Sequence, residues 1–289
     1  MQNLPNQQKI NPLHGLMRQP KIYIRLPSNG QYWAPGSLEV SETGEYPVYS
    51  MTAKDELALK VPDALMNGQA VVDVIQHCVP NIKNAWACPN LDLDILLIAI
   101  RLATYGEMMN TPVTIGELEL EYQVDLRVIM DQLQNQITWN PAVVINDELT
   151  VFVKPLTYKN ISHAAIQAFE TQKIMNVVND EKMSDEQKIT LFKESFAKMT
   201  QATLGTIIDS VDRIDSAHGS TSEHEHIKEF IDNIDKEIYS KIEQHLTSLR
   251  EQNTIRPMRV AVTPEMKERG VDQDFVEIPI TFDPSTFFV

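Results

Sequence analysis

The sequence has only two cysteines, Cys78 and Cys88. Two cysteines cannot form the disulfide framework of a small secreted domain, and their scarcity fits a reducing cytoplasm. Long apolar runs are missing too: the longest, from Ile95 to Ile100, is far shorter than the roughly 20 residues that cross a bilayer. The first residues also lack the apolar segment of a secretory signal. We therefore expect neither a disulfide-stapled scaffold nor a membrane-spanning protein.

Basic residues are outnumbered, since 25 Lys and Arg stand against 40 Asp and Glu and the formal net charge is −15. A chain this acidic is repelled by nucleic-acid phosphates and by anionic lipid, so we expect no nucleic-acid or membrane partner. Glycine-rich phosphate loops and the GxSxG and HExxH motifs are missing as well. We expect no enzyme, no catalytic residue, no bound metal and no cofactor.

Hydrophobic residues make up 43% of the chain, enough for a substantial core. The pattern along the chain predicts an α+β fold in four parts. Residues 1–20 hold three prolines and little periodicity, which predicts an extended N-terminal arm. Residues 21–155 predict a mixed helix and strand domain, and residues 156–255 predict a largely helical one. In residues 256–289, strand-like alternation predicts C-terminal strands that pack back onto the first domain.

Within the first domain, the alternation of KIYIRL (21–26) predicts a strand. Thr52 and Asp55 have the spacing of a capping box, in which each side chain bonds an unpaired amide of the helix start. Pro62 suits the first turn of another helix. The apolar faces of residues 91–107 predict a buried helix.

The rest of this domain shows a period of two over residues 112–124, with a change of phase at Gly116 that predicts a turn or bulge. A helix is expected near residues 125–134, and strands near 142–145 and 149–154. Together these elements complete the predicted α+β unit.

Residues 158–253 predict helices with little strand. Capping boxes at Ser184 with Gln187 and at Ser222 with Glu225 predict two helix starts. One apolar stripe predicts a nearly straight last helix. This stripe consists of Ile231, Ile234, Ile238, Ile242, Leu246 and Leu249.

His77 and Cys78 are the residue types of a base and a nucleophile. Adjacent helical residues point about 100° apart, however, and cannot bond each other in the geometry that catalysis needs. Cys78 shares the apolar face of its helix, so we expect a buried, inert thiol.

A second cluster contains His218, His224 and His226. His224 and His226 lie about 200° apart on a helix and cannot chelate one ion there, so a metal site needs His218 or a partner from elsewhere. The alternatives are a solvated helix start and a metal-dependent hydrolase that uses these three histidines.

Several segments together are familiar. Four of them resemble the baseplate hub and hub-assembly proteins of T4-like contractile-tailed bacteriophages. These segments are IYIRLPSNGQYW, YPVYSMTAKDELALKVPDALMNGQAVVDVIQHCVPNI, LDLDILLIAIRLATYGE and the closing FDPSTFF. The resemblance covers about residues 20–158 closely and the last ten or so residues again. It implies a non-enzymatic virion-assembly protein that acts in the host cytoplasm and has a possible place in the tail baseplate. The protein would be either a hub component or a hub-assembly chaperone.

The partners implied are other hub or tape-measure proteins, in a homo- or hetero-oligomer. An unrelated cytoplasmic adaptor is a further alternative. Large rigid aromatics give the most contact per ordered side chain, so we predict Tyr32, Trp33, Phe287 and Phe288 as partner-binding anchors. For the C-terminal pair, docking in a partner and packing against this chain's own core remain equal alternatives.

Overall fold

The computed structural model describes residues 13, 16–61, 67–115, 118–136, 138–178, 184–269, 271–278, 280 and 287. The structure is 50% helix and 21% strand, and its strands are distributed over several small sheets. The predicted α+β class is therefore confirmed. Among the helices of the described residues, none is both long and apolar enough to cross a lipid bilayer.

The first hydrophobic core surrounds helix α4 (Asn90–Tyr105). Every residue from Ile95 to Ile100 is buried, as expected for a helix that is apolar on all sides. The α1 helix (Ala53–Leu59) joins this core by packing on α3. The elements that contact α4 include β1 (Pro20–Ile24), β2 (Tyr46–Tyr49), α3 (Gln69–Cys78) and α5 (Leu126–Gln136).

Local signals set the ends of two of these helices. The Thr52 hydroxyl accepts a hydrogen bond from the backbone amide of Asp55, and Asp55 Oδ2 accepts one from the backbone amide of Thr52 at 2.7 Å. These two bonds confirm the capping box of α1. Gly106 ends α4 with a φ of 91°, a conformation that favours glycine. The prediction for Pro62 lies outside the described residues.

An antiparallel hairpin connects α4 to α5. Its strands are β3 (Met108–Ile115) and β4 (Leu118–Asp125), and Ile115 pairs with Leu118. The period-two pattern therefore corresponds to two strands, whereas the turn or bulge predicted at Gly116 lies outside the described residues.

A four-stranded antiparallel sheet has the order β5-β6-β7-β8. Strands β5 (Ala142–Asn146) and β6 (Leu149–Val153) confirm the sequence prediction. Strands β7 (Val211–Ser216) and β8 (Gly219–Thr221) correct it, because residues 158–253 had predicted little strand. These strands form because β7 pairs with β6 and buries Val211 and Ile214 in the second core. The sheet thus combines strands from both sides of residue 155. The domain boundary that we predicted there stays a prediction.

The predicted straight last helix is also wrong, because the structure has α8 (His224–Asn233) and α9 (Lys236–Asn253) in its place. Asp235 caps the start of α9, and its Oδ1 atom accepts a hydrogen bond from the backbone amide of Ile238 at 3.0 Å. Both helices turn their apolar stripe into the second core, so the stripe is continuous although the helix is not. The capping box predicted at Ser222 is wrong too, since Glu223 begins α8 without a side-chain cap.

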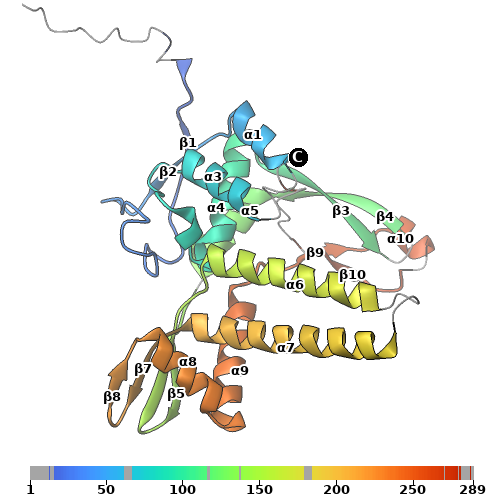
Figure 1. Cartoon of the computed structure of the whole chain (residues 1–289). Coiled ribbons are helices and arrows are strands. Elements are labelled where there is room, and N and C mark those ends of the chain that lie inside the picture. The colour runs from blue at the N-terminus through green and yellow to red at the C-terminus, as the bar shows by residue number, and fades with distance from the viewer. Residues whose placement is uncertain are drawn as a thin grey trace, which may run out of the picture.

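Two long helices connect strand β6 to strand β7 along the chain. They are α6 (Tyr158–Val178) and α7 (Asp185–Ser210), and the predicted capping box of Ser184 with Gln187 begins α7. Figure 1 shows α6 and α7 side by side, extending away from the four-stranded sheet, with α8 and α9 beside that sheet.

The C-terminal residues return to the first core, as predicted. Strands β9 (Met258–Ala261) and β10 (Phe275–Ile278) pair with each other, and α10 (Pro264–Glu268) lies between them in the chain. Ile255 and Phe287 are buried in the first core.

Candidate functional site

The segment LPSNGQYW (26–33) is held against α4 by the buried carboxylate of Asp92. Asp92 accepts hydrogen bonds from the Ser28 amide at 2.8 Å, the Ser28 hydroxyl at 2.5 Å and the Trp33 indole at 2.8 Å. Burial raises the pKa of Asp92 to about 6, although the bonds from Ser28 and Trp33 act in the opposite direction. These three donors fix the segment as part of the folded body.

Tyr32 contacts the second core. Its ring lies edge-on to Trp139, with 6.4 Å between the ring centroids, and Trp139 packs against the second core. Burial, followed by the charge of Asp212, raises the pKa of Tyr32. Trp33 is half-buried and packs against the first core. Both predicted anchors therefore have contacts inside the chain, and their role toward a partner stays a prediction.

Phe287 is only 3% exposed and belongs to the first core. The Arg101 guanidinium lies 5.3 Å from the centre of its ring and donates a hydrogen bond to the Phe287 carbonyl. Of the two alternatives for the C-terminal pair, the structure places Phe287 in the chain's own core. Phe288 lies outside the described residues.

The segment around His77 and Cys78 is structural in its contacts. His77 Nδ1 lies 2.7 Å from Asp55 Oδ1, so the carboxylate that caps α1 also fixes α3. Cys78 is buried as predicted, and burial raises the pKa of its thiol to about 11. Arg18 donates to the carbonyls of Ser50 and His77 and fastens the residues before β1 to this unit.

The three histidines of the second cluster lie around the start of α8. His218 is in the turn between β7 and β8, and His224 is the first residue of α8. His226 Nδ1 lies 3.1 Å from the hydroxyl of Thr221. In the described part of the chain, no group of three or more His, Cys, Asp or Glu residues is placed to hold a metal ion.

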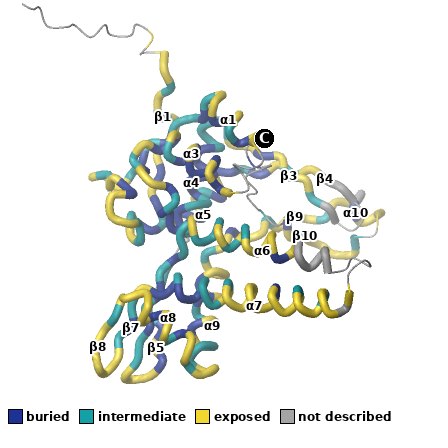
Figure 2. The backbone as a smooth tube through the Cα atoms, in the orientation of Figure 1, coloured by how far each residue is buried: buried dark blue, intermediate teal, exposed yellow. Residues whose placement is uncertain are grey.

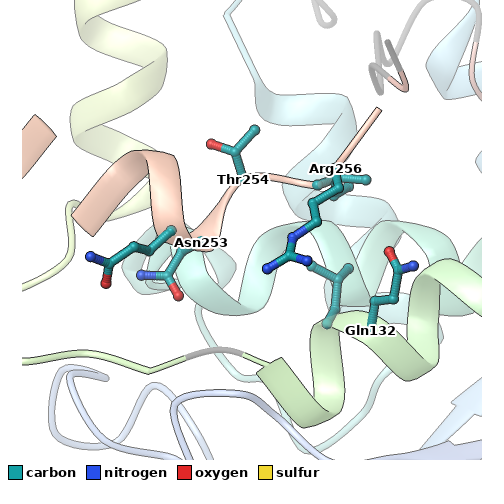
Figure 3. A pocket seen from close by; sticks show the side chains of 7 residues that line it. Gln132, Asn253, Thr254 and Arg256 are labelled. Carbon is teal, nitrogen blue, oxygen red and sulfur yellow. The ribbon is translucent and has the colours of Figure 1, made fainter. Parts of the chain in front are cut away.

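A small pocket lies between α5 and the end of α9 with the residues that follow it. Figure 3 shows Gln132 on α5 and Arg256 on the segment after α9 beside this pocket. Its volume is about 20 Å³, close to the minimum for one water molecule. The Asn253 amide donates to the carbonyls of Thr138 and Leu249 beside it. This pocket is too small for an organic ligand and is a packing feature of the junction.

A much larger groove of about 880 Å³ runs between α6 and α7. Its size is within the range of ligand and peptide sites. The Asn160 amide donates to Asp209 at 2.7 Å and ties the two helices together at one end. The lining combines alanines with amide and hydroxyl side chains and includes Met199 as a large apolar residue.

Large apolar side chains are exposed on the N-terminal half of α7, which Figure 2 colours mostly as exposed. The exposed fractions are 55% for Ile189, 50% for Phe192, 63% for Phe196 and 51% for Met199. We call these four residues the α7 stripe. Their spacings of three, four and three residues place them on one side of the helix, within an arc of about 80°. The α7 stripe was not predicted from the sequence, although this spacing is the signal that could have found it.

Comparison with known proteins gives one family. Residues 19–260 match the family described as T4 bacteriophage base plate protein. No curated protein and no solved structure shows significant similarity to the chain. The family match contains the second core, most of the first core and the α6–α7 pair, and it implies association with other phage tail proteins in the virion tail baseplate. With most of its length matched, the chain belongs to the T4 bacteriophage base plate protein family.

Proposed function

We propose that this protein is a permanent component of the baseplate hub and acts by binding other proteins, without catalysing a reaction. The observation that carries the proposal is the α7 stripe, a row of large apolar side chains exposed on a long helix. Scattered exposed apolar residues are ordinary on a protein surface, but a contiguous row on one helix side is typical of an interface.

A hub-assembly chaperone is the alternative within the same class of function. A chaperone would hold its client in an apolar groove, and the groove between α6 and α7 is the candidate for that role. Its lining is formed largely of small and polar residues, whereas Ile189, Phe192 and Phe196 lie outside it. The large apolar surface therefore faces outward, which favours a lasting interface with a neighbouring subunit.

The proposed partners are other hub proteins or tape-measure proteins, in a homo- or hetero-oligomer. In the proposed sequence of events the protein folds in the host cytoplasm, joins the hub during tail assembly and remains in the tail. The α7 stripe would be covered in that assembly.

Mass spectrometry of purified, intact phage particles tests this proposal. We expect peptides of this chain at a few copies per tail. Their absence from particles, together with abundant protein in the infected-cell lysate, would replace the permanent component with a chaperone that leaves. Near-stoichiometric metal in elemental analysis of the purified protein would favour the hydrolase alternative built on His218, His224 and His226.

A further inference from the structure

We infer that the α7 stripe binds an amphipathic helix of a partner protein whose apolar side is bordered by acidic residues. This inference rests on the proposed function, because it specifies the chemistry of the partner at the proposed interface. The stripe is long enough to bind a partner helix, because Ile189 and Met199 are ten residues apart. This separation is about 15 Å along the axis of α7, or nearly three helical turns. A partner helix lying along α7 can place its own apolar residues between these four side chains.

The charges beside the stripe select the partner. Taking 100° per residue, Lys188 lies about 60° from the middle of the stripe on one side, and Lys193 lies about 80° from it on the other. Glu194 is on the opposite side of α7. Glu186 lies about 100° from the middle on the same side as Lys193, but in the first turn, where an acid favours the helix dipole. Neither lysine takes part in an ion pair within the described residues. In a chain with a net charge of −15, an apolar stripe bordered by lysines on both sides is a distinct surface.

A second copy of this chain is a poor occupant of the same surface. If two α7 helices met in antiparallel orientation about the middle of the stripe, Lys193 would lie beside its counterpart in the other copy. If they met in parallel, Lys188 would lie beside the other copy's Lys193, because these are the flanking positions that approach each other between parallel helices. Either arrangement places like charges together, whereas acidic residues at those positions would meet the lysines with opposite charge.

Two synthetic helical peptides of equal length provide the test. Both carry the same leucine stripe, and one has glutamate at the flanking positions where the other has lysine. Binding of each fluorescent peptide to the full-length protein is measured by anisotropy at about 50 mM and about 500 mM salt, since screening weakens exposed charge pairs. We expect the glutamate peptide to bind at least tenfold more tightly at low salt and to lose most of that advantage at high salt.

Variants assign the effect to this surface. K188E/K193E should reverse the preference in favour of the lysine peptide, and F192S/F196S should abolish binding of both. The control K228E/K236E makes the same change in net charge at exposed positions of α8 and α9 and should leave the preference unchanged. The circular dichroism spectrum and melting temperature of each variant establish that it is folded.

The inference is overturned if the two peptides bind equally, or if K188E/K193E keeps the wild-type preference. It is also overturned if sedimentation shows a dimer of the wild-type protein that F192S/F196S removes, because the stripe then belongs to a second copy. These outcomes differ from failure of the proposed function. A protein present in purified tails that does not discriminate between the peptides contradicts only the chemistry inferred for the partner.

Discussion

The indole nitrogen of Trp33 lies 2.8 Å from Oδ2 of Asp92, and this hydrogen bond joins a surface segment to a fully buried residue of α4. Ser28 donates two further bonds to the same carboxylate. Buried carboxylates are costly unless donors satisfy them, so the three donors and the carboxylate depend on each other. The sequence LPSNGQYW is therefore fixed by a residue about 60 positions later in the chain.

Asp92→Asn should lower the free energy of unfolding at pH 7 by about 1–3 kcal/mol. The amide group of asparagine can replace one carboxylate oxygen but would turn its NH2 toward a donor, which leaves buried donors without an acceptor. Urea unfolding followed by tryptophan fluorescence measures the change. Asp94→Asn is the matched control, because no hydrogen bond to the Asp94 side chain is present in the described structure. A loss of stability in Asp94→Asn as large as in Asp92→Asn would contradict this account.

The free energy of unfolding should decrease as the pH rises from 5 to 7. Burial raises the pKa of Asp92 and of Asp94 to about 6, above the value near 4 of an unfolded chain. Between these values the folded state binds more protons than the unfolded state. This stabilisation is therefore complete below pH 4 and is lost as the pH rises through 6. We expect a decrease of about 1–3 kcal/mol, measured by urea unfolding at each pH. The double variant D92N/D94N should lack most of this dependence, and an unchanged slope would refute the assignment.

Phe287→Ala should destabilise the protein by about 3–5 kcal/mol, because it removes a buried aromatic ring from the first core. Phe275→Ala is the matched control, since Phe275 is 47% exposed and its loss should cost much less. Thermal unfolding of the two variants distinguishes this structural role from a role in partner binding. A Phe287→Ala protein with wild-type stability but weaker binding to hub proteins would return Phe287 to the role of an exposed anchor.

Asp235→Ala should cost about 1 kcal/mol, because Asp235 caps the start of α9. Asp232→Ala removes a similar exposed carboxylate near the end of α8, where no cap depends on it, and should change stability by less than about 0.5 kcal/mol. Chemical denaturation of both variants tests whether the chain really breaks between α8 and α9. Equal effects of the two substitutions would favour one continuous helix.

The sequence was most informative where local pattern and burial coincide. The apolar residues of α4 and the capping boxes of Thr52 and Ser184 act within one or two turns, so their spacing alone predicts them. Strand β7 could not be predicted in this way. Four of the six residues in its sequence VDRIDS are polar, and it becomes a strand through pairing with β6, which lies some 60 residues earlier.

The functional surfaces were harder to predict than the elements. The stripe of α8 and α9 predicted burial correctly but concealed the break at Asp235, because Ile234 and Ile238 face the same core on either side of it. Whether an aromatic residue is exposed depends on the whole fold. The predicted anchor Phe287 is buried, whereas Phe192 and Phe196 are exposed. Apolar spacing on α7 indicates one helix side, but only the folded structure shows that α6 packs on α7 and still leaves the stripe exposed.

Cross-linking mass spectrometry of purified phage tails tests the central claim most directly. With a lysine-to-carboxylate cross-linker, Lys188 and Lys193 should join to acidic residues of a different tail protein, in a segment with helical apolar spacing. Tails assembled with the F192S/F196S variant should lose these cross-links. Cross-links from these two lysines only within this chain, in tails where its other lysines reach neighbouring proteins, would contradict the claim that α7 forms the interface.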